Sequence, residues 1–426
     1  REYIPHFADR LKISWETMMS LGKIDPANPN EKFSMSNLAS NLSQEINGVS
    51  MLHGEVSREI LSPLWPGYLP EELHVSYVTN GVHYPTWTAG DWKSIYEKAF
   101  GAGFSEHIYD KSCFEGIYKV ADQKIWEIRN RLRERLMTFI KHTLSEPVTT
   151  VHYRPHQIVA IKEALRCDVL TIGFARRFAT YKRASLLFRD LERLSAIVNN
   201  KEQPVQFVFA GKAHPADKAG QDLIRRIIEV SLMPQFIGKI IFIPGYDMGV
   251  AKILVQGVDV WMNTPTRPLE ASGTSGEKAA MNGVMHFSVL DGWWVEGYKD
   301  GAGWALPKEV TYDDPASQDE LDAATIYNMI ETDIAPLFYQ LDKKSGLPLG
   351  WIKYIKNTIA QVASNFTTHR MMEDYQKKFY NPLNRRNERL VSNDYALARE
   401  ISYWKKRVKR EWPLIEVKNY IKPENS

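Results

Sequence analysis

The middle of the chain carries the pattern that most constrains the fold, an alternation of apolar runs and amphipathic stretches over 165–310. The apolar runs are 169–175, 205–210, 239–244, 258–263 and 285–290. Helical patterns lie between them, for example at 184–198 and 217–231. Continuous β-branched runs joined by helices indicate a parallel sheet that is buried on both faces. We therefore expect an α/β fold built on a doubly wound parallel sheet.

The flanking segments mostly show the spacing of amphipathic helices, with apolar residues three and four positions apart. The predicted helices are 35–49, 121–144, 320–334, 351–364 and 368–380. A short apolar run at 74–79, followed by an Asn-Gly pair, predicts a strand instead. The basic stretch beyond residue 393 is expected to form a solvated helix face and a polar tail.

Bulk composition excludes several classes of protein. The 426 residues are too many for one ordinary core, so we expect more than one domain. Basic and acidic residues number 54 and 51, which argues against nucleic acid or an anionic membrane surface as a partner. Cys113 and Cys167 provide neither a disulfide framework nor a zinc motif and fit a reducing compartment. No apolar run reaches the roughly 18 residues of a membrane span. No signal peptide is visible, so we expect a cytoplasmic protein. We also expect no metal site.

Three loops are candidates for chemistry, because ligands of doubly wound folds bind beyond the carboxyl ends of the strands. The first follows the run 169–175 and reads Arg176-Arg177-Phe178-Ala179-Thr180-Tyr181-Lys182-Arg183. Four cations within eight residues, at a strand end and a helix start, predict an oxyanion site. A solvated basic turn is the alternative.

The second loop follows the run 258–263 and reads Pro268-Leu269-Glu270-Ala271-Ser272-Gly273-Thr274-Ser275-Gly276-Glu277-Lys278. Its glycines would let the backbone approach a ligand closely, and the start of a helix predicted at 277–283 favours phosphate. The spacing is not that of a Walker loop. By its chemistry alone, Lys278 is a Schiff-base lysine, a phosphate contact or a solvated lysine, and the three interpretations stay open.

The third loop, 79–83, follows the predicted strand at 74–79 and contains Asn80 and Gly81. Asn-Gly is common in tight turns, which is the simpler interpretation. An Asn at a strand end can also hydrogen-bond a sugar hydroxyl.

Taken together, these loops resemble the α-glucan phosphorylase family (glycogen and maltodextrin phosphorylases). The similarity runs from about Phe33 to Leu306, in blocks that keep the order of the family. The blocks are 47–49 with 52–58, 79–82 with Trp87, 174–183, 209–215, 270–283 and 290–294. The sequence around Lys278 and the Asp291-Gly292-Trp293-Trp294 run are similar to the shorter, mostly prokaryotic branch.

The resemblance implies a GT-B architecture, in which two Rossmann-like lobes face a cleft. It divides the chain into a helical remnant of the N-terminal lobe (1–70), a Rossmann-like C-terminal catalytic lobe with the cofactor site (71–315), and C-terminal helices with a polar tail (316–426). The family's N-terminal lobe, with its glycine-rich loop and the histidine for the glucose 6-hydroxyl, is expected upstream of Arg1. We therefore expect this chain to be inactive alone.

The implied reaction is a reversible phosphorolysis with retained configuration. Inorganic phosphate attacks the non-reducing terminal glucose of an α-1,4-glucan and releases α-glucose 1-phosphate. The implied cofactor is pyridoxal 5'-phosphate, whose phosphate group takes part in the reaction, and the family implies a homodimer for the full-length protein. No pair of protein carboxylates is needed, unlike in ordinary glycosidases.

The resemblance also implies roles for individual positions. Lys278 matches the Schiff-base lysine, and Arg177 and Lys182 match the cations that hold the substrate phosphate. The groups implied to lie beside the cofactor are Arg176, Thr274, Ser275 and Trp87. The groups implied to hold hydroxyls of the transferred glucose are Asn80, Glu270, Ser272 and Gly273. Fixed cations would offset the repulsion between the two phosphates.

Four further positions are less specific. Glu277 departs from the Met that is usual in the animal and plant enzymes, and its carboxylate either faces solvent or alters the charge beside Lys278. Trp293 and Trp294 are interpreted as packing residues. His53 is either a structural histidine or a residue near the cofactor cleft.

Two other functions compete with phosphorolysis. A nucleotide-sugar glycosyltransferase of the glycogen synthase type also uses an Arg/Lys pair, but many such enzymes have two glutamates eight positions apart in the second loop. Here the residue eight positions after Glu270 is Lys278. A non-catalytic glucan-binding relative would be expected to lose some of the chemical residues, and Arg177, Lys182, Thr274 and Lys278 are all present. Cofactor uptake discriminates the last alternative from the enzyme.

Overall fold

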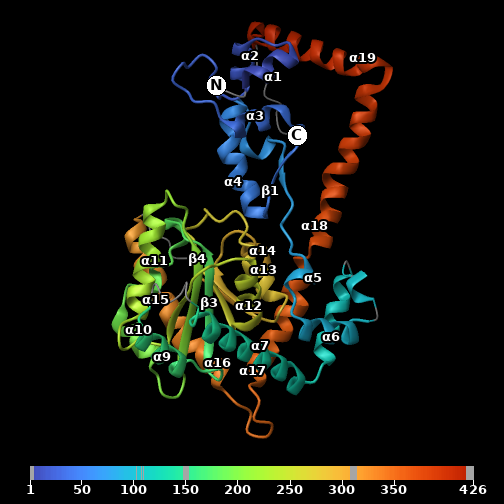
Figure 1. Ribbon diagram of the computed structural model, residues 1–426. Helices are drawn as coiled ribbons and strands as arrows, with labels where there is room; N and C mark the ends of the chain where they lie inside the picture. The colour runs from blue at the N-terminus through green and yellow to red at the C-terminus, as the bar shows by residue number, and fades with distance from the viewer. Residues whose placement is uncertain are drawn as a thin grey trace. The chain divides into compact units, whose positions relative to one another are not determined.

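A computed structural model describes residues 4–101, 103–106, 108, 110–146, 153–307 and 314–418. Its centre is a six-stranded sheet in which every neighbouring pair is parallel (Figure 1). In spatial order the strands are β5 (Ile240–Ile243), β4 (Val205–Lys212), β3 (Leu170–Arg177), β6 (Val260–Asn263), β7 (Met285–Val289) and β8 (Gly303–Leu306). The order reverses between β3 and β6, so their carboxyl ends form the switch point of the sheet. The predicted doubly wound sheet is confirmed.

Helices cover both faces of this sheet (Figure 1). Those of one face are α10 (Leu191–Val198), α11 (Lys218–Ser231), α15 (Pro315–Met329), α16 (Ala335–Tyr339) and α17 (Leu349–Asn357). Those of the other face are α9 (Pro155–Ala164), α12 (Met248–Gly257) and the C-terminal half of α7 (Asp122–Thr143). Helices on both faces leave no sheet face for solvent, which explains why the strands read as continuous apolar runs.

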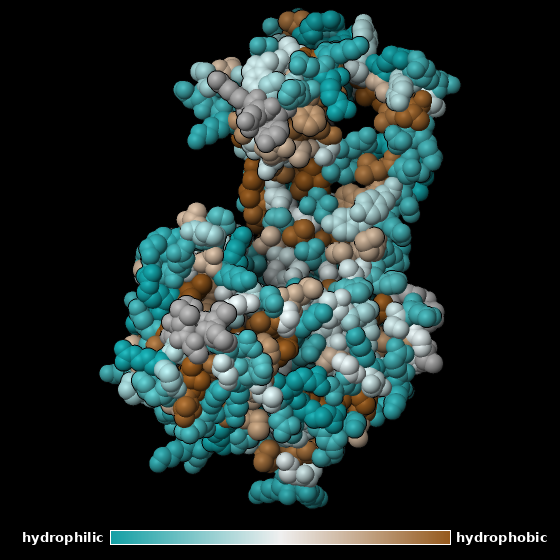
Figure 2. Space-filling view, viewed as in Figure 1, coloured by the Kyte–Doolittle hydropathy of each residue, from teal (hydrophilic) through white to brown (hydrophobic). Residues whose placement is uncertain are grey.

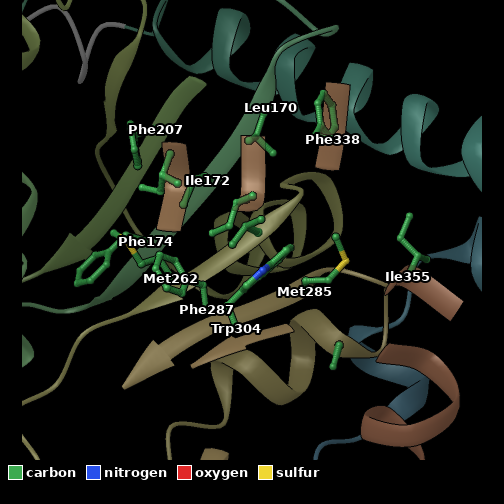
Figure 3. Packing of buried hydrophobic residues seen from close by; sticks show 14 of the residues in the cluster. Leu170, Ile172, Phe174, Phe207, Met262, Met285, Phe287, Trp304, Phe338 and Ile355 are labelled. Atoms are coloured by element: carbon green, nitrogen blue, oxygen red, sulfur yellow. The ribbon is translucent and has the colours of Figure 1, made fainter. Parts of the chain in front are cut away.

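Neighbouring side chains of one strand lie on opposite faces of the sheet and pack in two different hydrophobic clusters. Phe207 of β4 lies in one hydrophobic cluster, whereas Val208 lies in the other. Figure 3 shows the first cluster, in which Ile172 of β3 lies near Phe207 and residues of β6, β7 and β8 continue the same layer. The period of two is that of an extended strand, and here both of its faces are apolar.

The part of the chain before the large sheet consists of short helices and a small sheet. The helices are α1 (Ile4–Leu11), α2 (Trp15–Ser20), α3 (Met35–Leu42), α4 (Met51–Leu61), α5 (Tyr84–Trp87) and α6 (Gly90–Ala99). The helix predicted over 35–49 is wrong beyond Leu42, because Ser43 is extended (φ −93°, ψ 143°). The chain then forms β1 (Ile46–Gly48), which pairs in parallel with β2 (Val75–Tyr77). Its apolar spacing fits a helix, but the partner strand decides the conformation.

The chain divides into two compact units, 1–371 and 372–426. The helices predicted at 320–334, 351–364 and 368–380 are present, and each includes a π-helical turn. These turns are Ile330–Ile334, Thr358–Val362 and Gln376–Tyr380. The basic stretch belongs to α19 (Asn381–Glu411), which has no buried residue and leaves helical geometry between Ser392 and Tyr395. The solvated helix face is therefore confirmed where the structure describes it.

Hydrophilic residues dominate the visible surface over α11 (Figure 2), whereas Ile227 and Val230 of that helix are buried against the sheet. None of the helices in the described part of the chain combines the length and the apolar character needed to cross a membrane.

Candidate functional site

The first and second predicted loops meet at the switch point of the sheet. Arg176, at the end of β3, donates a hydrogen bond from NH1 to Oδ1 of Asn263, at the end of β6. Its NH2 donates to Oε2 of Glu270 at 2.8 Å. The parallel arrangement of β3 and β6 therefore brings a cation and a carboxylate from distant parts of the sequence together.

A second cation shares the same carboxylate. Lys182 lies in the 3₁₀ turn Thr180–Lys182, and its Nζ forms an ion pair with Oε2 of Glu270. The side chains of Arg176, Lys182 and Glu270 are each only 9% exposed. Burial lowers the pKa of Arg176, and the neighbouring Glu270 opposes that effect. One carboxylate thus balances two buried cations.

The other two cations of the first loop lie in different environments. Arg183 adopts a left-handed conformation (φ 48°) and donates to the carbonyls of Thr264 at 3.0 Å and Pro265 at 2.9 Å. It also pairs with Asp319 at 3.0 Å and Asp322 at 2.7 Å. Arg177 is exposed, and it has no ion pair with any residue in the described ranges. Arg183 is therefore a structural clamp, while Arg177 remains accessible.

Residues 291–293 brace the glycine-rich loop. Oδ2 of Asp291 accepts the backbone N–H of Glu270 at 2.9 Å, and its Oδ1 accepts that of Gly292 at 2.8 Å. The N–H of Trp293 donates to the carbonyl of Ser272 at 2.9 Å. A Cβ on Gly292 would lie 2.4 Å from that carbonyl oxygen, so only glycine allows this approach. Burial raises the pKa of Asp291 to about 6. Sequence reasoning noted this run but missed the bracing role of Asp291.

The loop leads into α13 (Ser275–Ala280), which begins two residues before the predicted helix. Thr274 is its N-cap residue, and Oγ of Ser275 accepts a hydrogen bond from Nε1 of Trp261 at 3.0 Å. Nζ of Lys278 lies 4.1 Å from the centroid of the Trp87 ring. Burial lowers the pKa of Lys278. A larger fraction of this amine is therefore unprotonated, and nucleophilic, than for a solvated lysine.

Asn282 holds Trp87 and Lys278 in place and was not found from the sequence. This fully buried side chain donates from Nδ2 to the carbonyls of Trp87 and Lys278, both at 3.0 Å. Its Oδ1 accepts the N–H of Ala89 at 2.8 Å. A lone Asn near a helix end carries no signal of such a role. The role depends on residues 87–89, which are distant in the sequence and which the fold places beside Asn282.

Several polar groups next to this loop are buried and have no hydrogen-bond partner in the described structure. They are both carboxyl oxygens of Glu277, both ring nitrogens of His286, Nε1 of Trp293, Oγ of Ser272 and Nε of Arg176. Burial raises the pKa of Glu277 well above its usual range, which favours the neutral form of this carboxyl. The solvent-facing interpretation of Glu277 is wrong, since the residue is fully buried. Burial likewise lowers the pKa of His286 to about 3, which leaves its ring neutral.

The third predicted loop is joined to the second through α4. Ser50, the N-cap residue of α4, donates from Oγ to the carbonyl of Ala271 at 2.7 Å. The N–H of Asn80 donates to the carbonyl of Val49, beside that N-cap, at 3.0 Å. The Asn80 side chain is partly buried and forms no hydrogen bond with the described residues. The structure thus places Asn80 on a segment that is joined to the glycine-rich loop, and its side-chain amide is available to a ligand.

The lesser candidates have structural environments. Nδ1 of His53 accepts the N–H of Val49 at 3.1 Å, as expected for a structural histidine. Trp293 and Trp294 are fully buried, which confirms that they are packing residues. Among the residues described here, no group of three or more His, Cys, Asp and Glu side chains is placed to bind a metal ion.

The geometry combines three chemical elements at the carboxyl edge of the sheet. Two buried cations share one carboxylate, a lysine amine with a lowered pKa faces an indole ring, and a glycine-rich loop opens a helix. Such an arrangement can bind phosphate groups and can form a covalent bond with a carbonyl compound.

Comparison with known proteins agrees with the sequence resemblance. The family described as carbohydrate phosphorylase matches residues 2–301. A glycogen phosphorylase of Aquifex aeolicus is 43% identical over 371 residues, which are 87% of this chain and 52% of that protein. A maltodextrin phosphorylase of Thermococcus litoralis is 38% identical over 92% of this chain and 46% of its own length. A glycogen phosphorylase of Mycobacterium bovis is 37% identical over 92% of this chain and 45% of its own length. The chain spans about half the length of these curated relatives.

Proposed function

The chain belongs to the carbohydrate phosphorylase family, and we propose that it forms the cofactor-binding wall of an α-1,4-glucan phosphorylase. The reaction is attack of inorganic phosphate on the terminal glucose, with release of α-glucose 1-phosphate and retained configuration. The observation that carries the proposal is the pairing of Arg176 and Lys182 with Glu270 at the switch point of the sheet. The relatives' names, glycogen phosphorylase and maltodextrin phosphorylase, support this substrate class over nucleotide-sugar transfer.

Pyridoxal 5'-phosphate fits the residues around Lys278. The amine has a lowered pKa and faces the Trp87 ring, as suits a lysine that binds a carbonyl carbon. Thr274, Ser275 and Arg176 would hold the cofactor phosphate, and the buried Nε of Arg176 is a donor that still needs an acceptor. When bound, the cofactor would supply a phosphate group that exchanges a proton with the substrate phosphate.

Lys182 and Arg177 would hold the inorganic phosphate. Arg177 is exposed and already accessible, but Lys182 is paired with Glu270. We infer that the incoming phosphate replaces Glu270 as the partner of Lys182. The released carboxylate would then accept a hydrogen bond from a glucose hydroxyl, the role that the family resemblance gives to Glu270. This exchange couples occupancy by phosphate to occupancy by sugar.

The remaining sugar contacts would come from Asn80, Ser272 and Gly273. The side-chain amide of Asn80 and the hydroxyl of Ser272 have no hydrogen-bond partner among the described residues, so both can serve a hydroxyl of glucose. Gly273 has a positive φ of 85°, which suits a backbone that approaches a ligand. As the glycosidic bond breaks, its oxygen receives a proton from the inorganic phosphate, and the cations at the switch point hold that phosphate beneath the developing positive charge.

The test is borohydride reduction of the protein after incubation with pyridoxal 5'-phosphate, followed by peptide mass mapping. We expect a stable pyridoxyl adduct on the peptide that contains Lys278. The variant Lys278→Ala should lose it, and Lys218→Ala, which removes an exposed lysine of α11, should keep it. An adduct that is spread over surface lysines, or that survives in Lys278→Ala, would contradict the assignment.

The natural polypeptide that carries these residues is the proposed enzyme, with α-1,4-glucan, inorganic phosphate and glucose 1-phosphate as its partners and a homodimer as its assembly. We expect residues 1–426 alone to show no phosphorolysis, because the chain spans about half the length of its curated relatives. Release of glucose 1-phosphate from maltodextrin by this chain alone would contradict that expectation.

A further inference from the structure

The segment 365–370 lies against the loop that carries Asn80. The N–H of Val82 donates to the carbonyl of Phe366 at 2.8 Å, and that of Thr368 donates to the carbonyl of Val82 at 3.0 Å. A Cβ on Gly81 would lie 2.2 Å from the carbonyl oxygen of Thr367. Because no side chain fits between the two segments, Gly81 is required for this approach and not only for a turn.

Arg370 adds a side-chain contact to the same loop. Its NH1 donates to the carbonyl of Thr79 at 2.7 Å, and its NH2 donates to the carbonyl of Asn80 at 2.8 Å. Its Nε donates to the carbonyl of Asn365 at 2.9 Å. One planar guanidinium thus fixes two successive peptide groups relative to a third, a geometry that a lysine cannot reproduce.

The opposite side of the loop is held by Glu296, a residue of α14 (Trp294–Gly297), whose Trp294 and Gly297 are buried. Both of its carboxylate oxygens accept from Oγ1 of Thr79 at 2.8 Å, and Oε2 also accepts the N–H of Met51 at 2.9 Å. These contacts use the hydroxyl of Thr79 and the carbonyls of Thr79 and Asn80. None of them uses the side-chain amide of Asn80, which has no hydrogen bond with any residue that the structure describes.

We propose that Arg370 is a positioning residue for sugar binding, which holds the peptide groups of Thr79 and Asn80 so that the Asn80 amide meets a glucose hydroxyl. This inference rests on the proposed function. Arg370 itself would touch neither substrate nor cofactor. Its replacement should weaken recognition of the sugar and leave cofactor uptake at Lys278 unchanged.

The test is a double-mutant cycle on the natural polypeptide, with Arg370→Lys, Asn80→Ala and the double variant. We expect Arg370→Lys to lower kcat/KM for glucose 1-phosphate by roughly 10- to 100-fold, since a displacement of about 1 Å can cost 10²-fold. If Arg370 acts through Asn80, the double variant should be no worse than Asn80→Ala. Additive losses would overturn the proposal, because they would mean that Arg370 acts independently of Asn80.

A second variant covers the case in which Arg370→Lys does not fold. Thr79→Val removes the hydroxyl that Glu296 accepts, with little change in volume, and should lower kcat/KM by about 3- to 10-fold, again not additively with Asn80→Ala. All variants should still give the pyridoxyl adduct on Lys278. No adduct and no turnover in the unmutated protein would contradict the proposed function. Normal wild-type behaviour with unaffected variants would contradict only the role of Arg370.

Discussion

Two buried clusters with the same balance of charges lie near opposite ends of β6. At its amino end, Asp259 pairs with Arg133 at 2.8 Å and with Arg129 at 3.6 Å, and none of these side chains is more than 2% exposed. At its carboxyl end, Glu270 pairs with Arg176 and Lys182. Each cluster combines two cations with one carboxylate, so charge alone does not distinguish them.

The difference lies in how completely the donors are satisfied. Arg129 donates to the carbonyls of Val258, Gln256 (2.6 Å) and Asn282 (3.3 Å), while Arg133 also donates to that of Cys167 (3.0 Å). At the other end, Nε of Arg176 has no partner in the described structure. Carbonyls complete the first cluster and make it a brace between α7 and the sheet. The second cluster keeps donor capacity for an anion, at the edge where such folds bind ligands.

The largest expected effect comes from breaking the brace. Asp259→Asn leaves two buried guanidinium groups without a counter-charge, and we expect a loss of about 3–5 kcal/mol in the free energy of unfolding. Urea denaturation measures it. Asp91→Asn is the matched control, because Asp91 also pairs with two arginines of α7, which are about half exposed. That variant should lose less than about 1 kcal/mol. Equal losses in the two variants would mean that burial does not determine how much the Asp259 ion pairs contribute to the free energy of unfolding.

The second prediction distinguishes the two clusters by their response to inorganic phosphate. Glu270→Gln should cost about 1–3 kcal/mol, because two cations lose their shared acceptor. Inorganic phosphate should restore much of that loss by binding the same cations, whereas it should not restore Asp259→Asn. Thermal melting with and without millimolar phosphate checks both. If phosphate restored the stability of both variants, or of neither, the Asp259 cluster and the Glu270 cluster would not differ in their ability to bind an anion.

A third carboxyl group, that of Glu277, extends the comparison because none of the described residues forms a hydrogen bond with it. Its pKa is raised in the folded protein by burial, so the folded state binds more protons than the unfolded state once the pH exceeds the unfolded pKa. Stability contributed by this group therefore falls as the pH rises. The free energy of unfolding of Glu277→Gln should therefore rise relative to that of the wild type as the pH increases above the unfolded pKa, by at most about 1.4 kcal/mol per pH unit. A stability difference that does not change with pH would show that Glu277 ionises normally.

The smallest effect on stability is expected at Arg177, the exposed cation. Arg177→Ala should leave the free energy of unfolding within about 0.5 kcal/mol of the wild type, since no described contact is lost. It should nevertheless weaken the phosphate rescue of Glu270→Gln, because Arg177 is proposed to hold the same anion. An unchanged rescue would assign phosphate binding to Arg176 and Lys182 without Arg177.

Much of the fold was predictable because its signals are local. Strands β3 to β7 are apolar runs buried on both faces, and α7 has an unbroken apolar stripe. The exceptions depend on distant partners. β8 has four residues, as β5 and β6 do, but it begins at a glycine with φ 152°, so its sequence carries little strand signal, and it exists because it pairs with β7. β1 likewise extends because β2 lies beside it.

The sequence by itself determined that four cations lie within eight residues at the end of one apolar run, and that a glycine-rich loop with a lysine follows another. Only the tertiary structure assigned different environments to those cations. Arg183 meets Asp319 and Asp322, Arg176 and Lys182 meet Glu270, and Arg177 meets no carboxylate in the described chain. The physical reason is that the behaviour of a charge depends on its burial and on its partners. Those partners come from segments that the fold, and not the local sequence, brings together.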